Sequence, residues 1–586
     1  MPKPVESIPF NLSFLKSFAR LFALYWWSEE RWRALRLLVF SVVLTFAAVR
    51  GSLMINQGNK LFFDALQSVN RSQVLAAFYP FSLGISLWIG SEAVAFYCKE
   101  RLCARWRQWL TTNHLVRWFA DHKHYHLSMD ATVDNPDQRI SEDLGSFPVL
   151  TLGLFFLLLN AVLLLVSYGY LLWDISSTMR VPIAGHSVTL YGYLFWCALF
   201  YGGLSLVLTQ KIGKKLAILD FLSERYGANF RYALVRSREA SEPIALSNTG
   251  TQEASRLKRL YDAVFANTLD TINLRTRLNA CAGFFSGSGA IVGAVVTLPL
   301  FFMQHAQMGT LIQASGAFAM VFSAFKMLAQ SFDEFAQWKS VVYRLFQFNQ
   351  ALDKAPVRAK SVVHHHAVSS IHVNNLSVSL PNGQALFSRL TMVFDSGASY
   401  LIQGPSGIGK SVFLRTMAGI WPHAQGEIFY PQEKSMVFVP QKPYLPMTSL
   451  ADFLCSSGGV MLDDEALQML LQRVQLHKYA RRLHEVQHWQ SILSLGEQQR
   501  LFLVPLLIKK PDIIFLDEAT SALDVASERD FYQLIKEEIP QATIISIGHR
   551  ETLHAYHQYR IHLNDVRLFT ESEVSPSDEA LSINVP

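Results

Sequence analysis

The stretch Gly404-Pro405-Ser406-Gly407-Ile408-Gly409-Lys410-Ser411 follows the strand-like Ser399-Tyr400-Leu401-Ile402 and precedes the helical Val412-Phe413-Leu414-Arg415. A glycine-rich loop between a strand and a helix lets backbone N–H groups wrap phosphate groups, and the helix N-terminus favours anions. We expect Lys410 to reach the β and γ phosphates of a nucleotide and Ser411 to hold Mg²⁺. The stretch therefore predicts a P-loop and an α/β nucleotide-binding domain.

An acidic pair follows a second apolar strand downstream of this loop. The strand Ile513-Ile514-Phe515-Leu516 ends in Asp517-Glu518. In P-loop enzymes one carboxylate belongs to the Mg²⁺ shell, and a neighbouring group prepares the attacking water. We expect Asp517 to be the metal partner and Glu518 the general base.

The first half of the chain has a different composition. Of the 586 residues 50% are hydrophobic, and apolar blocks crowd into residues 36–330. Runs near 20 residues predict six membrane spans. They lie at residues 36–58, 75–97, 148–173, 187–208, 278–303 and 311–330.

Charge sets the expected orientation of these spans. The loops 99–147 and 210–277 hold 7 and 12 Lys plus Arg, whereas residues 174–186 hold only Arg180. Positive loops remain in the cytoplasm, and their helical periodicity predicts extensions of the spans. The net charge of +6 is spread over these loops, so membrane topology accounts for it and we expect no nucleic-acid partner.

Between the P-loop and the acidic pair lies Leu493-Ser494-Leu495-Gly496-Glu497-Gln498-Gln499-Arg500, which resembles the signature motif of ABC ATPases. Gln441 then matches the Q-loop of that family, Ser521-Ala522-Leu523-Asp524 the D-loop, and His549 the switch histidine. The resemblance implies an ABC exporter-type six-helix all-α transmembrane domain followed by an α/β P-loop ABC ATPase domain.

The resemblance also implies roles for single residues. Ser494, Gly496 and Gln498 would contact ATP held on the P-loop of another subunit, so the partner is a second copy in a homodimer. Gln441 would join Ser411 and Asp517 around Mg²⁺. Glu518, Gln441 and His549 would form the catalytic group.

Three positions depart from the family pattern. Leu495 places a side chain where the usual signature has glycine. Pro505 is expected to interrupt the helix after the signature. Leu380 stands where many relatives place an adenine-stacking aromatic residue, so it offers adenine only apolar contact.

One branch of the family is the most similar. The segments Ala418-Gly419-Ile420-Trp421-Pro422, Pro440-Gln441-Lys442-Pro443-Tyr444 and Asn135-Pro136-Asp137-Gln138-Arg139 resemble the peroxisomal fatty-acyl (subfamily D) half-transporters and the bacterial SbmA/BacA-like transporters fused to an ATPase. The bacterial relatives are associated with uptake of vitamin B12, bleomycin and antimicrobial peptides. The resemblance implies coupling positions at Asn135, Asp137, Arg139 and Glu142, and at Glu239 and Glu242.

These likenesses predict an ATP-driven transporter that moves peptide, cobalamin-like or other hydrophilic cargo across the bacterial inner membrane, with the ATPase domain in the cytoplasm. A fatty acid or fatty acyl-CoA cargo is the alternative. A membrane-anchored ATP-binding sensor without transport is the alternative of another class. Glu92 falls inside the second span, where a carboxylate is expected to face a cavity or a partner.

The remaining boundaries follow from composition. We expect an N-terminal amphipathic elbow at residues 1–34, whose aromatic face lies on the membrane or packs on other helices, and the transmembrane domain at 35–350. A linker at 351–370 contains His364-His365-His366, interpreted as a solvated hinge. The ATPase domain spans 371–570, and residues 571–586 are expected to be disordered. Proline 136 is expected to end one helix and Ser141 to cap the next.

Overall fold

The computed structural model describes residues 11–129, 135–176, 179–183, 186–304, 307–354, 362–366, 368–564 and 581–584. The chain divides into two compact units. The helical unit comprises residues 1–116 and 133–351, and the P-loop unit comprises residues 117–132 and 352–586.

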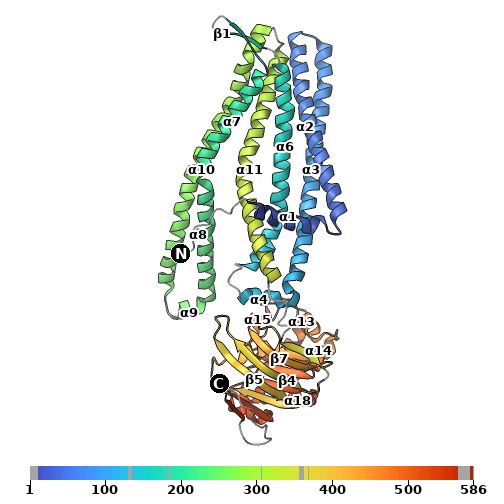
Figure 1. The fold of residues 1–586 in the computed structure, drawn as a ribbon, viewed down its shortest axis with the longest axis vertical. Coiled ribbons are helices and arrows are strands. Elements are labelled where there is room, and N and C mark those ends of the chain that lie inside the picture. The colour runs from blue at the N-terminus through green and yellow to red at the C-terminus, as the bar shows by residue number, and fades with distance from the viewer. Residues whose placement is uncertain are drawn as a thin grey trace. The chain divides into compact units, whose positions relative to one another are not determined.

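Long helices dominate the helical unit (Figure 1). The helices of this unit are α1 (Leu12–Trp26), α2 (Arg31–Gln67), α3 (Arg71–Phe119), the short α5 (Pro136–Gln138), α6 (Leu144–Ile175), α7 (Tyr193–Gly213), α8 (Leu216–Glu239), the short α9 (Ser241–Leu246), α10 (Gly250–Gln304) and α11 (Met308–Lys354). Six helical segments among the described residues are long and apolar enough to cross a membrane, which confirms the six predicted spans.

The fourth span begins later than predicted. An antiparallel hairpin of β1 (Met179–Ile183) and β2 (His186–Leu190) precedes it, and α7 starts only at Tyr193. The apolar residues Val188 and Leu190 extended the predicted span backwards, but they alternate with Ser187 and Thr189 in the period of a strand. Hydropathy alone does not separate such a strand from the start of a helix.

The expected helical arms are confirmed. Helices α8 and α10 run side by side beyond the apolar spans (Figure 1). The amide of Asn267 donates to the carbonyl of Leu219 at 3.0 Å, and Arg275 pairs with Asp220 at 3.2 Å. These polar contacts suit segments that leave the hydrocarbon region.

The aromatic face of α1 packs inside the helical unit. The ring of Phe18 lies 5.0 Å from that of Trp338 on α11, and the ring of Phe22 lies 5.6 Å from that of Trp106 on α3. Edge-to-face contacts at these distances are favourable. The aromatic face of α1 therefore packs on other helices and does not lie on the membrane surface.

The segment before α6 differs from its prediction. Pro136 opens α5, and Ser141 lies inside a π-helix (Arg139–Asp143) that continues into α6, so the predicted cap at Ser141 is wrong. The predicted end of a helix before Pro136 falls on residues 130–134, which lie outside the described part of the chain. Pro136 lacks the N–H that the first turn of a helix leaves unpaired, which suits it to this position. Asp143 is buried, and its carboxylate pairs with Arg139 at 2.9 Å and Arg344 of α11 at 2.6 Å.

The P-loop unit combines two sheets with short helices (Figure 1). Its strands are β3 (Val363–His366), β4 (Ile371–Ser379), β5 (Ala385–Phe394), β6 (Ser399–Gln403), β7 (Ala424–Pro431), β8 (Met436–Val439), β9 (Ile513–Asp517), β10 (Thr543–Ile547), β11 (Tyr559–Asn564) and β12 (Leu581–Asn584). Its helices are α4 (Lys123–Met129), α12 (Lys410–Met417), α13 (Leu450–Gly458), α14 (Asp464–Arg473), α15 (Trp489–Ile492), α16 (Leu495–Leu501), α17 (Leu503–Lys509) and α18 (Val525–Glu538).

The central sheet of this unit is parallel, with strand order β12-β11-β6-β10-β9-β8. The second sheet has the order β3-β7-β4-β5. Every residue of β6 is buried, and four of the five residues of β9 are. Strands of a parallel sheet end at a common edge, so the loops after β6, β8, β9 and β10 converge there.

Two predictions about the ends of this unit are wrong. His364, His365 and His366 belong to strand β3, which pairs with β7 at the edge of the second sheet, so the tract is not a solvated hinge. Leu581–Asn584 pairs with β11, so this part of the tail is a strand and not disordered. Residues 571–580 lie outside the described part of the chain.

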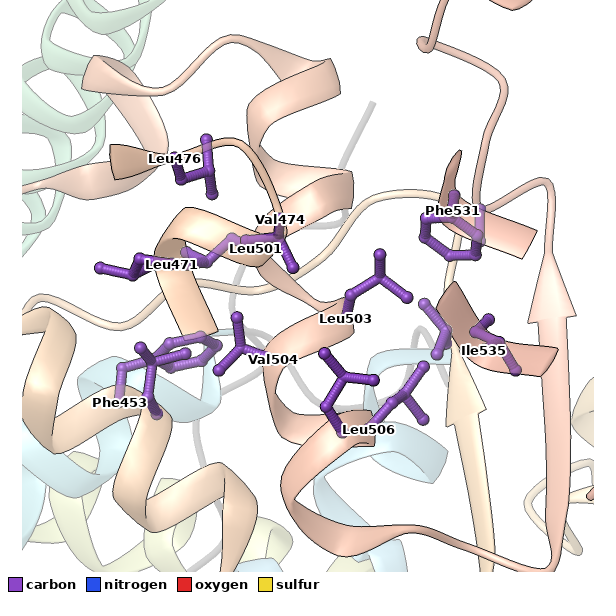
Figure 2. Packing of buried hydrophobic residues seen from close by; sticks show 14 of the residues in the cluster. Phe453, Leu471, Val474, Leu476, Leu501, Leu503, Val504, Leu506, Phe531 and Ile535 are labelled. Atoms are coloured by element: carbon purple, nitrogen blue, oxygen red, sulfur yellow. The ribbon is translucent and has the colours of Figure 1, made fainter. Parts of the chain in front are cut away.

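An apolar core joins the helices of this unit that follow the Q-loop. Figure 2 shows side chains of α13, α14, α16, α17 and α18 converging, among them Phe453, Leu471, Leu503 and Phe531. The helix after the signature breaks at Phe502 between α16 and α17, three residues before Pro505. This fits the expected interruption, because Pro505 cannot donate to the preceding turn.

Candidate functional site

The P-loop connects β6 to α12. Gly409 precedes α12 with φ of 106°, a left-handed conformation that side chains disfavour. Lys410 is 6% exposed, and its Nζ donates to the carbonyls of Gly404 at 2.8 Å and Pro405 at 3.0 Å. Burial lowers the pKa of Lys410, while the Glu518 and Asp517 carboxylates oppose that change.

The next residue of α12 contacts the end of β9. Ser411 Oγ donates to Asp517 Oδ1 at 3.1 Å. Burial raises the pKa of Asp517 above its usual value, and Glu518 adds to this, while the Ser411 hydrogen bond and the cations Arg415 and Lys410 oppose it. A hydroxyl and a carboxylate side by side are the oxygen donors that Mg²⁺ prefers.

Glu518 lies where three loops meet. Gln441 Nε2, after β8, donates to Glu518 Oε2 at 2.6 Å, and His549 Nε2, after β10, lies 3.7 Å from Glu518 Oε1. Glu518 has φ of 49°, and its N–H donates to the carbonyl of Ile547 at 3.0 Å. A left-handed non-glycine residue is uncommon and persists where its surroundings hold it, as these contacts do.

A cavity of about 440 Å³ in the P-loop unit adjoins these side chains, and Ser411, Gln441 and Asp517 line it. The structure therefore brings together Lys410, Ser411, Gln441, Asp517, Glu518 and His549, which the sequence placed at one site. Such a group can bind a phosphate chain, hold a metal ion and take a proton from water.

The signature segment forms the start of α16. Ser494 caps this helix, with its Oγ accepting from the N–H of Glu497 at 3.3 Å and the Glu497 carboxylate accepting from the N–H of Ser494 at 2.9 Å. A Cβ on Gly496 would lie 3.0 Å from the carbonyl oxygen of Ala522, so the D-loop packs against this glycine. Leu495 is 40% exposed.

Gln498 and Gln499 both face the interior of the unit. The Gln498 amide donates to the carbonyls of Gln490 and Leu493, each at 2.9 Å. Both of its N–H donors are thus used within the unit, and we restrict the nucleotide contacts proposed below to Ser494 and Gly496.

Sequence reasoning missed Gln499, which is 1% exposed. Its Oε1 accepts from the N–H of Ala522 at 3.1 Å, and its Nε2 donates to Ser521 Oγ at 3.3 Å. The same Nε2 lies 3.5 Å from the carbonyl oxygens of Gln441 and Glu518. The only signal in the sequence was its place beside the signature motif.

Comparisons with known proteins agree with this geometry. Residues 21–302 match the family model "ABC transporter transmembrane region 2", and residues 387–521 match "ABC transporter". An uncharacterized ABC transporter ATP-binding protein of Haemophilus influenzae is 33% identical over 538 residues, covering 89% of this chain and 88% of that protein. The chain belongs to the ABC transporter family.

Two further relatives and one solved structure are similar to this chain over most of its length. The inner membrane ABC transporter ATP-binding protein YddA of Escherichia coli is 28% identical over 93% of this chain and 97% of its own length. ABC transporter D family member 2, chloroplastic, of Arabidopsis thaliana is 29% identical over 92% of this chain and 85% of its own length. The chain is similar in fold to a bacterial Atm1-family ABC exporter with ATP bound, with a TM-score of 0.71 at 18% identity, covering 91% of this chain and 95% of that one.

The transporter is therefore a half-transporter of the ABC family with an exporter-type fold, a multi-pass membrane protein with a C-terminal ATPase domain that hydrolyses ATP. Both likenesses expected from the sequence, to subfamily D and to bacterial ATPase-fused transporters, are confirmed.

The structure separates two segments of the first long loop of the transporter. Asn135, Asp137, Arg139 and Glu142 belong to the helical unit, where Asn135 has φ of 47° and Glu142 accepts from Gln138 at 3.0 Å. Residues 117–132 instead belong to the P-loop unit. Within that unit Tyr125 of α4 lies near the guanidinium of Arg415 on α12, and Met129 packs on the core around β6.

The three predicted carboxylates outside these segments, Glu92, Glu239 and Glu242, are exposed. Glu239 ends α8 and Glu242 lies in α9, which joins α8 to α10. Glu92 is exposed on α3, forms no ion pair with the described cations, and lines neither the cavity beside the P-loop nor the cavity between α7, α10 and α11. Leu380 is half-buried and packs on the core around β6.

Proposed function

We propose that two copies of this chain form a homodimer in which ATP is held between the P-loop of one copy and Ser494 and Gly496 of the other. Each chain carries one P-loop and one signature segment, and ABC half-transporters work as dimers. Gly496 supports this role, because its missing side chain lets the D-loop carbonyl of Ala522 pack directly against the start of α16. The helix N-terminus at Ser494 favours an anion.

We propose that Glu518 takes the proton from the attacking water. The observation that carries this proposal is the meeting of Gln441 and His549 on the Glu518 carboxylate, beside Lys410 and Ser411. Gln441 orients the carboxylate, and His549 lies where it can contact the γ phosphate. Each group comes from a different loop, so closure of the dimer can tune their alignment.

Mg²⁺ fits the donor set at the same place. Ser411 Oγ and the Asp517 carboxylate lie 3.1 Å apart, and Gln441 lines the same cavity. These three residues would hold the ion, which supplies neutralisation of charge on the phosphate oxygens.

Transport follows if ATP binds best to the closed dimer and closure is passed to the membrane helices. We propose that α4 carries this signal, because Met129 packs on the core around β6 and Tyr125 lies near Arg415 of the helix that begins with Lys410. The segment from Asn135 through Asp137 and Arg139 to Glu142, and the turn holding Glu239 and Glu242, remain our further coupling candidates.

The cargo is proposed to be hydrophilic, such as a peptide or a cobalamin-like molecule, moved across the bacterial inner membrane. The bacterial relatives support this location. Long-chain fatty acid or acyl-CoA cargo is the alternative, which the D family relative favours. An ATP-binding sensor without transport is opposed by the complete set of catalytic side chains.

ATP hydrolysis by the lipid-reconstituted protein tests the proposal. The wild type and Glu518→Gln are titrated with cobalamin, a cationic peptide and a long-chain acyl-CoA. Stimulation of the wild type by one cargo, with turnover of the variant lowered at least about 100-fold, supports the transporter and names its cargo. Absence of hydrolysis in both the wild type and the variant, with ATP bound by both, supports the sensor.

A further inference from the structure

The helical unit contains a cavity of about 1080 Å³ between α7, α10 and α11. Helices α7 and α10 lie along each other in Figure 1. Aliphatic and aromatic side chains form much of the wall, among them Leu206, Phe322 and Phe325. An apolar chain could therefore fill most of this space.

Three cations line the same cavity. Lys211 and Lys214 lie at the end of α7, and Lys326 lies on α11. No carboxylate is found among the described lining residues, and no described Asp or Glu forms an ion pair with these lysines. The amides of Gln210, Asn279 and Gln330 add hydrogen-bond donors. The polar part of the cavity is thus suited to an anion.

Lys211 and Lys326 share one depth along their helices, and Lys214 follows three residues after Lys211. Lys211 is 18 residues from the start of α7 at Tyr193, and Lys326 is 18 residues from the start of α11 at Met308. At 1.5 Å per residue both lie about 27 Å along, close to the thickness of the hydrocarbon core of a bilayer. Leu206 and Phe322 lie only about 20 Å along, which is deeper in the membrane.

A single lysine at a membrane interface commonly extends its ammonium group toward water, so one such lysine does not by itself indicate a bound anion. Here Lys326 falls within the predicted span 311–330, and it faces a concavity that two lysines of another helix also line. Basic pockets between membrane helices on the cytoplasmic side bind anionic lipid headgroups. The lysines lie at the membrane interface and the apolar wall lies deeper in the membrane. This is the order of the headgroup and acyl chain in a lipid of the cytoplasmic leaflet.

We propose that this cavity binds an anionic phospholipid, with its phosphate among Lys211, Lys214 and Lys326 and an acyl chain along Leu206, Phe322 and Phe325. The site is separate from the ATP site and does not depend on the identity of the cargo. A phospholipid with a neutral headgroup lacks the net charge that three cations would balance.

The test counts the lipids retained by the full-length protein. The protein is placed in nanodiscs of phosphatidylcholine with one-fifth phosphatidylglycerol, recovered in mild detergent, and analysed by native mass spectrometry. We expect phosphatidylglycerol to be retained over phosphatidylcholine. Removal of each lysine should weaken retention about fivefold, so Lys326→Gln shows a clear loss and Lys211→Gln with Lys214→Gln a larger one.

Lys215→Gln is the matched control, because Lys215 follows Lys214 directly and does not line the cavity. It should retain phosphatidylglycerol as the wild type does, and Lys326→Arg should as well, since it keeps the charge. Unchanged size-exclusion profiles and unfolding temperatures separate lost binding from lost folding. Equal retention by the wild type and the Gln variants would overturn the proposal, as would an equal loss in Lys215→Gln.

A second arm separates a bilayer lipid from a free single-chain anion. Dodecyl phosphate is added to protein in the same nanodiscs, which contain one-fifth phosphatidylglycerol, with dodecyl trimethylammonium as the cationic control. Displacement of retained phosphatidylglycerol by dodecyl phosphate alone supports the shared anionic site. Binding of dodecyl phosphate without any retention of phosphatidylglycerol would overturn the phospholipid assignment.

Discussion

The charged groups of the P-loop unit and of the helical unit are arranged in different ways. In the P-loop unit Lys410, Asp517 and Glu518 each contact a polar partner whose position is set by a strand end. In the helical unit Asp143 is buried between two arginines, whereas Lys326 faces a cavity without a described counter-ion. The charged groups of the first unit form one reaction site. Those of the second unit either stabilise helix packing or line a cavity.

Loss of the P-loop lysine should give the largest effect and should be confined to one unit. Lys410→Ala removes the cation that reaches the phosphates, so we expect ATP hydrolysis to fall at least about 100-fold. Melting of the membrane helices should not change. Measured hydrolysis within a few-fold of the wild type would break the assignment of this site.

Loss of the buried Asp143 carboxylate should lower the stability of the helical unit and leave the ATP site unchanged. Asp143→Asn leaves Arg139 and Arg344 without their shared anion, and breaking such a buried pair costs about 3 kcal/mol. We expect a lower unfolding temperature in detergent, followed by tryptophan fluorescence, with ATP affinity retained. Glu142→Gln, at the exposed neighbouring position, should leave the unfolding temperature unchanged.

Gln499 tests whether the loops around Glu518 act together. Gln499→Leu leaves the N–H of Ala522 without its acceptor, which costs about 1 to 3 kcal/mol. We expect kcat to fall about tenfold because the carbonyls of Gln441 and Glu518 lose a shared donor, with a smaller change in KM. Gln499→Glu keeps the acceptor for Ala522, so it should recover stability more than kcat.

The smallest effect is expected at α4. Tyr125→Phe removes the hydroxyl group near the Arg415 guanidinium, and we expect this to cost at most about 1 kcal/mol. Basal hydrolysis should stay near the wild-type rate, while stimulation by cargo should fall by up to about fivefold. An equal loss of basal and stimulated rates would place Tyr125 in the ATP site instead of the coupling path.

Sequence reasoning succeeded where the functional residues are consecutive in the chain. The P-loop and the pair Asp517-Glu518 follow strands directly, so strand, turn and side-chain chemistry can be read together. The six spans were found because hydropathy reports burial in lipid, but it placed β2 inside the fourth span, since a short apolar strand and a helix start look alike.

Contacts between distant residues could not be predicted in the same way. Lys211 and Lys326 share a cavity although 115 residues separate them, and helical periodicity does not tell which helices pack together. The first loop shows the same limit, because the resemblance pointed to Asn135 while residues 117–132 belong to the P-loop unit.

Complementation between two inactive chains tests most directly whether each ATP site is shared by two copies. Lys410→Ala and Gly496→Asp are co-expressed with different tags, purified through both tags and assayed for ATP hydrolysis, after each variant alone is shown to fold. A mixed dimer contains one intact pair, the P-loop of the Gly496→Asp chain facing the signature of the Lys410→Ala chain. We predict hydrolysis well above either variant alone, up to about half the wild-type rate per dimer. Mixed dimers as inactive as the separate variants would contradict a site completed across the two copies.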